Sequence, residues 1–152
     1  MTSQVQIDQR VKSFIAACRQ HGIKATQQRM EILRELASTE EHPDAETVFA
    51  RVRKRLPTIS LDTVYRTLRT LEENEIISRV GSMRERARFD ANTAPHHHFV
   101  CSDCGLIGDF YCDELQGFPP PPEVADMGSV DSVYIELRGR CRACQIKRDR
   151  TE

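Results

Sequence analysis

Residues 60–71 read Ser60-Leu-Asp-Thr-Val-Tyr-Arg-Thr-Leu-Arg-Thr-Leu71, and this stretch decides how the first half of the chain folds. Its large apolar residues recur every three or four positions, the spacing of a helix with one buried face. They are Leu61, Val64, Leu68 and Leu71. Ser60 is a preferred N-cap, so the sequence predicts a helix over residues 61–74 that turns its polar side chains outward.

Shorter amphipathic segments precede this helix. The first has its apolar stripe over residues 11–18 and a stop signal at Gly22, and Thr26 is placed to cap the second. Pro43-Asp44 opens a third, which should end before Pro57 because the residue preceding a proline resists helical geometry. A hairpin follows, with strands over 76–80 and 84–90 and a Gly81-Ser82 turn. Short helices followed by a hairpin predict a winged helix-turn-helix domain; another small helical bundle is the alternative.

The outward side chains of this region suit DNA. Arg66 can donate two hydrogen bonds to a guanine edge, Tyr65 can contact a thymine methyl group or a phosphate, and Thr63 lies in the first helical turn, where hydroxyls meet phosphate. On the second hairpin strand Arg84, Arg86 and Arg88 alternate, so they share one face that suits phosphate or the minor groove. A solvated charged face is the alternative for any one of these residues.

The charged residues are distributed unevenly between the two halves of the chain. Residues 1–88 hold 16 Lys/Arg against 12 Asp/Glu, whereas residues 89–152 hold 6 against 11. The basic half is the candidate for nucleic acid. No apolar run is long enough to span a membrane and the N-terminus lacks the design of a signal peptide, so we expect a cytoplasmic protein. The predicted organisation is a DNA-binding domain over 1–90, a hinge over 91–95 and a metal-binding domain over 96–152.

Two Cys-x-x-Cys pairs mark the second half. Cys101 and Cys104 form the first pair, and Cys141 and Cys144 form the second after 36 intervening residues. Two such knuckles supply the tetrahedral four-sulfur shell that zinc favours, and a shell filled by protein makes the site structural. Buried, unliganded cysteines and a thiol-disulfide enzyme are the alternatives, but the enzyme needs only one Cys-x-x-Cys. Cys112 has no apparent partner.

A second set of histidines and aspartates, residue types that bind metals, lies before and after the first cysteine pair in the sequence. In a strand His96 and His98 share a face while His97 points away, and Asp109 lies on the next short strand. Asp90 precedes them and His42 lies at the start of the third helix. A mixed nitrogen and oxygen shell suits Fe(II), Mn(II) or Zn(II). On spacing alone, a solvated histidine run is the alternative.

These motifs, in this order, resemble the ferric uptake regulator family. The resemblance rests on 22–29, His42-Pro-Asp-Ala45, Thr63-Val-Tyr-Arg-Thr-Leu68, Arg88-Phe-Asp90, 96–105 and 139–144. It implies an α+β fold, in which a winged-helix DNA-binding domain precedes a small α/β dimerisation domain with a structural zinc site. It also implies a homodimeric, metal-dependent repressor that binds operator DNA and is not an enzyme. A metal- or thiol-dependent oxidoreductase is the rival from another class.

The resemblance also assigns the two metal sites. It puts structural Zn(II) on the four cysteines, and regulatory Fe(II) or Mn(II) on His42, Asp90, His96, His98 and Asp109. Aspartate rather than glutamate at 109 is typical of the peroxide-responsive branch, in which peroxide is the signal and iron-catalysed oxidation damages a ligand histidine, here His42 or His96. An iron- or manganese-responsive uptake repressor is the alternative. Pro119–Pro122 falls where the family has a helix, so that helix should be short or displaced.

Overall fold

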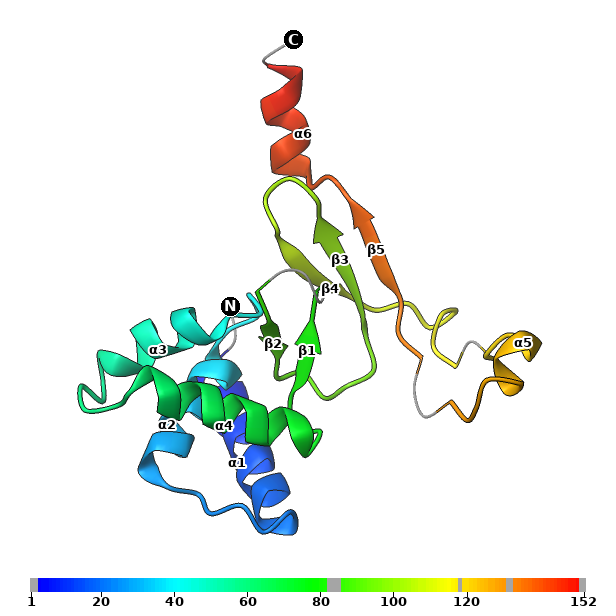
Figure 1. Cartoon of the computed structure of the whole chain (residues 1–152). Helices are drawn as coiled ribbons and strands as arrows, with labels where there is room; N and C mark the ends of the chain where they lie inside the picture. The colour runs from blue at the N-terminus through cyan, green and yellow to red at the C-terminus, as the bar shows by residue number, and fades with distance from the viewer. Residues whose placement is uncertain (1–2, 82–85, 118, 131–132, 151–152) are drawn as a thin grey trace. The chain divides into compact units, whose positions relative to one another are not determined.

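The computed structural model of the chain describes residues 3–81, 86–117, 119–130 and 133–150. The chain divides into two compact units, Met1–Thr93 and Ala94–Glu152, with the boundary inside the stretch 91–95. Each unit combines helices with a small sheet, so the predicted α+β class is confirmed (Figure 1).

The first unit is a helical bundle with a small antiparallel wing. Its helices are α1 (Gln4–Gln20), α2 (Gln27–Ser38), α3 (Ala45–Arg53) and α4 (Leu61–Glu73), and its strands are β1 (Ser78–Val80) and β2 (Arg88–Asp90). The predicted caps are present: the side chains of Thr26, Asp44 and Ser60 each accept a hydrogen bond from a backbone N–H three residues further on. Each cap satisfies a donor that a helix start leaves without an internal partner.

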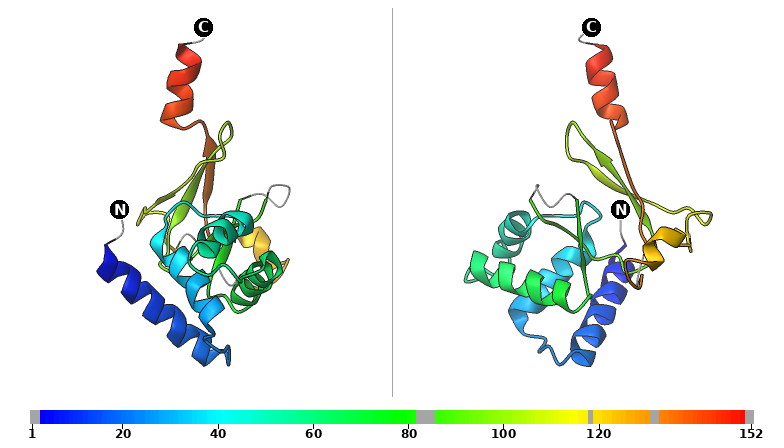
Figure 2. Two further views of the ribbon diagram at one scale, coloured as in Figure 1. Left: turned by 90° about the vertical axis from the view of Figure 1, so that its left-hand side faces the viewer. Right: turned by 45° about the vertical axis from the view of Figure 1, so that its right-hand side comes forward.

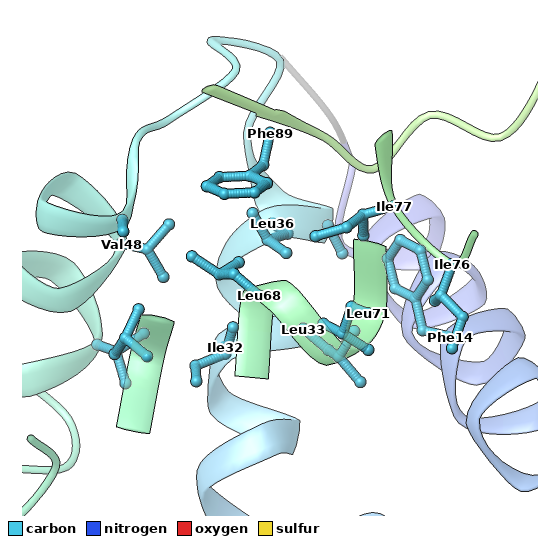
Figure 3. Packing of buried hydrophobic residues seen from close by; sticks show 14 of the residues in the cluster. Phe14, Ile32, Leu33, Leu36, Val48, Leu68, Leu71, Ile76, Ile77 and Phe89 are labelled. Atoms are coloured by element: carbon cyan, nitrogen blue, oxygen red, sulfur yellow. The ribbon is translucent and has the colours of Figure 1, made fainter. Parts of the chain in front are cut away.

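The core of this unit forms around the stripe of α4. Val64, Leu68 and Leu71 are fully buried, and the ring of Phe89 from β2 points toward Leu36 and Leu68 (Figure 3). The wing therefore rests on the same apolar cluster as the helices. The opposite face of α4 remains exposed, as the sequence predicted, and this face holds Tyr65 and Arg66.

The second unit is a three-stranded sheet. The central strand β3 (His97–Cys101) pairs antiparallel with β4 (Ile107–Phe110) and parallel with β5 (Glu136–Gly139), and the register sets His98 opposite Asp109. A four-residue helix, α5 (Pro122–Ala125), precedes β5. Helix α6 (Arg142–Asp149) follows β5 and extends from the end of the sheet (Figure 2).

Several boundaries differ from those predicted. Helix α3 ends at Arg53 instead of continuing to Leu56, and the first strand of the wing begins at Ser78 rather than at residue 76. Pro122 takes the first position of α5, where a proline loses no hydrogen bond, so the expected short helix begins inside the proline run. Helix α6 was not predicted because Ile146 is its only large apolar residue and leaves no stripe to recognise. Arg84 lies outside the described residues.

Candidate metal and DNA-binding sites

The four predicted zinc ligands come together in the second unit. Cys101 ends β3, Cys104 follows in the turn, Cys141 caps α6, and Cys144 lies in its first turn. Their sulfur atoms all lie within 4.8 Å of one another, and the Sγ atoms of Cys104 and Cys141 are 3.8 Å apart. A tetrahedral zinc ion with Zn–S bonds of about 2.3 Å separates its sulfurs by about 3.8 Å. The arrangement therefore fits Zn(II).

Backbone geometry prepares the cysteine cluster for a cation. Gly105 takes φ +71°, a conformation that suits glycine, and completes the turn after Cys104. The backbone N–H of Cys141 donates to Cys101 Sγ at 3.2 Å. This bond, with a second from Cys104, lowers the pKa of Cys101 to about 6. Hydrogen bonds with the neighbouring sulfurs of Cys141 and Cys104, together with burial, raise the pKa of Cys144 to about 12, and the negative charge of Cys101 adds to the shift.

Two histidines and a carboxylate converge on one face of the same sheet. The Nε2 atoms of His96 and His98 are 2.9 Å apart, and Asp109 Oδ1 lies 3.6 Å from the first and 3.5 Å from the second. His96 Nδ1 donates to the carbonyl oxygen of Ala94 at 2.7 Å, so in the neutral ring Nε2 carries the lone pair. The His97 ring points away and packs against the ring of Phe110 at a tilted angle. Three donor atoms thus face one point, an arrangement that fits a divalent metal ion.

The other two predicted ligands form a pair within the first unit. His42 lies in the loop before α3 and Asp90 ends β2, both are buried, and His42 Nε2 is 3.6 Å from Asp90 Oδ2. The other carboxylate oxygen, Oδ1, accepts a hydrogen bond from the backbone N–H of Asn92 at 2.7 Å. That bond orients Asp90 with its second oxygen toward the imidazole, so this pair also fits a divalent metal ion.

The predicted DNA-reading residues have different surroundings. Tyr65 is 49% exposed on α4, and Arg66 is held by Asp62 at 2.8 Å in an exposed ion pair. The Thr63 hydroxyl hydrogen-bonds to that of Ser60. Arg86 forms ion pairs with Glu46 and Asp44. Arg88 does not extend the outer face of the wing, because its guanidinium turns onto the loop that carries His42.

A basic hollow beside α4 was missed by sequence reasoning. It has a volume of about 350 Å³ and lies between the start of α2 and the outer face of α4. Lys24, Gln28 and Arg29 line one wall, and Thr63 and Arg66 line the other. Their charge was visible in the sequence, but their position beside α4 depends on how α2 and α4 pack together. The hollow gives the exposed face of α4 a second row of groups that can contact phosphate.

A winged helix with a polar face on its last helix, joined to a domain with two clusters of metal-binding side chains, defines a metal-responsive transcription regulator. The sequence model of the ferric uptake regulator family matches residues 20–124, and the chain belongs to that family. No helix among the described residues combines the length and apolar character that crossing a bilayer requires.

Known proteins similar to the chain include both a sequence relative and solved structures. The peroxide-responsive repressor PerR of Staphylococcus aureus strain Mu50 is 33% identical over 141 residues, which cover 93% of this chain and 95% of that protein. The ferric uptake regulator of Pseudomonas aeruginosa with manganese has a TM-score of 0.68 at 28% identity, covering 84% and 96% of the two chains. The ferric uptake regulator of Helicobacter pylori has a TM-score of 0.71 at 24% identity, covering 91% and 93%, and shows the shared fold.

Proposed function

We propose that this regulator is a peroxide-responsive repressor that binds operator DNA as a homodimer when a regulatory Fe(II) or Mn(II) ion is bound. The convergence of His96, His98 and Asp109 carries the proposal, because these residues offer two imidazole nitrogens and a short carboxylate to one ion. The 33% sequence identity to a peroxide-responsive repressor supports the same proposal.

The proposed ligands fall into two sites with different tasks. Cys101, Cys104, Cys141 and Cys144 hold a structural Zn(II) ion, which stabilises the sheet because it connects the end of β3 to the start of α6. His42, Asp90, His96, His98 and Asp109 hold the regulatory ion. Because these ligands precede and follow the stretch 91–95, binding one ion restricts the hinge and favours one arrangement of the two domains. That arrangement is the one that binds DNA.

The DNA contacts follow from the exposed face of the first unit. Arg66 and Tyr65 read base edges, and Thr63 binds phosphate. Arg84 and Arg86 contact the DNA backbone or the minor groove. Arg66 must leave Asp62, and Arg86 must leave Glu46, before either binds DNA. Lys24 and Arg29 add phosphate contacts from the neighbouring hollow.

Peroxide ends repression by modifying a ligand. Bound Fe(II) supplies the redox chemistry that activates peroxide beside the ligands. His42 or His96 then gives two electrons and gains one oxygen atom on a ring carbon, while the second peroxide oxygen leaves as water. The modified ring is a poor metal ligand, so the site loses its ion and the hinge is released. Mn(II) does not support this oxidation, and a manganese-loaded repressor is expected to ignore peroxide.

An iron- or manganese-responsive uptake repressor is the second candidate. The similar solved structure of the Pseudomonas aeruginosa regulator contains manganese, which supports sensing of the metal level itself. The two candidates differ in their response to peroxide, since the uptake repressor keeps intact histidines and stays on DNA.

Metal-dependent DNA binding tests the part that both candidates share. A tight-binding sequence is selected from a random duplex pool with the zinc-loaded protein and Mn(II). Binding to that duplex is then measured by fluorescence anisotropy with and without Mn(II). We expect binding to weaken at least tenfold when Mn(II) is withheld and zinc is retained. Equal affinity in both conditions would rule out a metal-dependent repressor.

A further inference from the structure

The loop that carries His42 has an unusual backbone. His42 takes φ +52°, in the left-handed region that residues with a side chain rarely adopt. Pro43 follows, and its ring disfavours helical geometry at His42. The Pro43 carbonyl oxygen accepts a hydrogen bond from the backbone N–H of Phe89 at 3.1 Å, and Asp44 pairs with Arg88 in an isolated bridge. The loop therefore pairs along β2 while His42 keeps an uncommon conformation.

The Arg88 side chain donates hydrogen bonds to this loop on both sides of the His42 Cα atom. Its Nε donates to the carbonyl oxygen of His42 at 2.6 Å, and its second guanidinium nitrogen, Nη2, donates to the carbonyl oxygen of Glu41 at 2.5 Å. These carbonyl groups belong to the two peptide planes that flank the His42 Cα atom. Rotation about φ moves one plane and rotation about ψ moves the other. A rigid guanidinium bonded to both planes therefore fixes both angles, and with them the direction in which the His42 side chain leaves the backbone.

The same strand also supplies a proposed ligand. Asp90 lies two residues after Arg88 on β2, and its carboxylate faces His42. One short strand thus presents a carboxylate to the regulatory ion and holds the backbone of the histidine opposite. The Arg88 guanidinium donates hydrogen bonds to backbone carbonyls. The guanidinium of Arg79 on β1 instead makes two hydrogen bonds to the carboxylate of Glu72.

We propose that Arg88 is a positioning residue for the regulatory metal: by bonding to the carbonyls of Glu41 and His42 it holds the His42 imidazole in the orientation that binds the ion. The proposal rests on the proposed function, because it assigns His42 as a regulatory ligand. Residues that hydrogen-bond to a metal ligand and orient it commonly change metal affinity by about 10- to 100-fold when they are replaced. Arg88 is expected to act in that range.

The test measures Mn(II) affinity in the full-length, zinc-loaded protein for the wild type, Arg88→Ala, Arg88→Lys and the matched control Arg79→Ala. Free Mn(II) is followed by electron paramagnetic resonance, bound zinc by elemental analysis, and thermal unfolding is recorded on the same samples. We expect Arg88→Ala to weaken Mn(II) binding about 10- to 100-fold and to keep its zinc. Arg88→Lys, which replaces the fork with a single nitrogen, should fall in between, and Arg79→Ala should match the wild type.

The outcomes separate the proposal from the function on which it rests. A purely structural role predicts a lower unfolding temperature with unchanged Mn(II) affinity of the folded protein, and that result would overturn the proposal while the proposed function stands. Arg88→Lys keeps the test decisive if Arg88→Ala does not fold, since wild-type affinity in a folded lysine variant has the same meaning. If the wild type binds no Mn(II) beyond its zinc, the proposed function fails and the positioning role fails with it.

Discussion

His96 Nε2 lies 2.9 Å from His98 Nε2, on the face of β3 that also meets Asp109. Two ring nitrogens at this separation are a chelate for one ion, because both lone pairs point to the same place. We expect His98→Ala to abolish tight Mn(II) binding while zinc content stays at one ion per chain. Isothermal titration calorimetry and elemental analysis measure the two quantities.

The neighbour of these histidines provides a matched control. His97 packs against Phe110 on the opposite face of the strand, so His97→Gln is expected to lower the unfolding temperature and leave Mn(II) affinity within about twofold of the wild type. If His97→Gln weakened Mn(II) binding as much as His98→Ala does, the face assignment would be wrong.

The length of the carboxylate at position 109 should tune the peroxide response. Asp109 Oδ1 lies about equally far from both imidazoles, and the additional methylene of Asp109→Glu changes where the oxygen falls. The variant is expected to retain metal-dependent DNA binding but to require more peroxide to release DNA. Anisotropy of an Fe(II)-loaded complex, titrated with peroxide, measures this. Unchanged sensitivity would show that Asp109 has no such role.

The cysteine cluster should make the second unit depend on zinc. Cys104→Ser is expected to lose zinc and to lower the unfolding temperature, because the binding energy of a structural zinc ion contributes to folding. Cys112→Ser, outside the cluster, should behave as the wild type. Zinc affinity should also fall as the pH is lowered, since thiols bind metal as thiolates and the pKa of Cys144 is raised to about 12. Zinc release that does not depend on pH would contradict thiolate ligation.

Two positions on the DNA-binding face should have different signatures. Arg66→Ala is expected to cost about 1–3 kcal/mol on the selected duplex and to relax its sequence preference. Lys24→Ala should weaken all sequences alike and reduce the salt dependence of binding by about one ion. Arg34→Ala, which removes an exposed ion pair with Glu31 on α2, is the control. Identical effects of Arg66→Ala on selected and random duplexes would exclude base reading.

The cap of α3 offers a test of the fold that depends on pH. Burial raises the pKa of Asp44, but hydrogen bonds from Thr47 and the charge of Arg86 outweigh burial and hold that pKa below its usual range. Asp44→Ala should cost about 1 kcal/mol of unfolding free energy at neutral pH. A depressed pKa stabilises the fold above the unfolded value near 4, and that part is lost as the pH falls through the folded value. Chemical denaturation between pH 7 and 3 should show the difference shrinking; a constant difference would contradict this assignment.

The sequence predicted the features that depend on local chemistry. Caps such as Ser60 and the apolar stripe of α4 are read within one helical turn, and the Cys-x-x-Cys spacing identifies a knuckle without knowledge of the fold. Alternation along a strand was enough to set His96 and His98 on one side and His97 on the other.

Features that depend on tertiary packing could not be predicted. Arg88 alternates with Arg86 along the wing, and alternation alone assigned both to the outer face. The Arg88 guanidinium instead donates hydrogen bonds to the carbonyl oxygens of a loop that lies 46 residues earlier in the chain. The wall of the hollow formed by Lys24 and Arg29 likewise depends on packing between α2 and α4. Helix α6 begins directly after Cys141 and has almost no apolar face, so its sequence carries little periodic signal.

Peptide mass spectrometry after peroxide treatment tests the central claim most directly. The zinc-loaded protein is charged with Fe(II) or with Mn(II), exposed to a small excess of peroxide, and digested. The proposed function predicts one added oxygen on His42 or His96 in the iron-loaded sample, a parallel loss of DNA binding, and neither change with manganese. Intact histidines and continued DNA binding in the iron-loaded sample would contradict peroxide sensing and leave a repressor that responds to the metal alone.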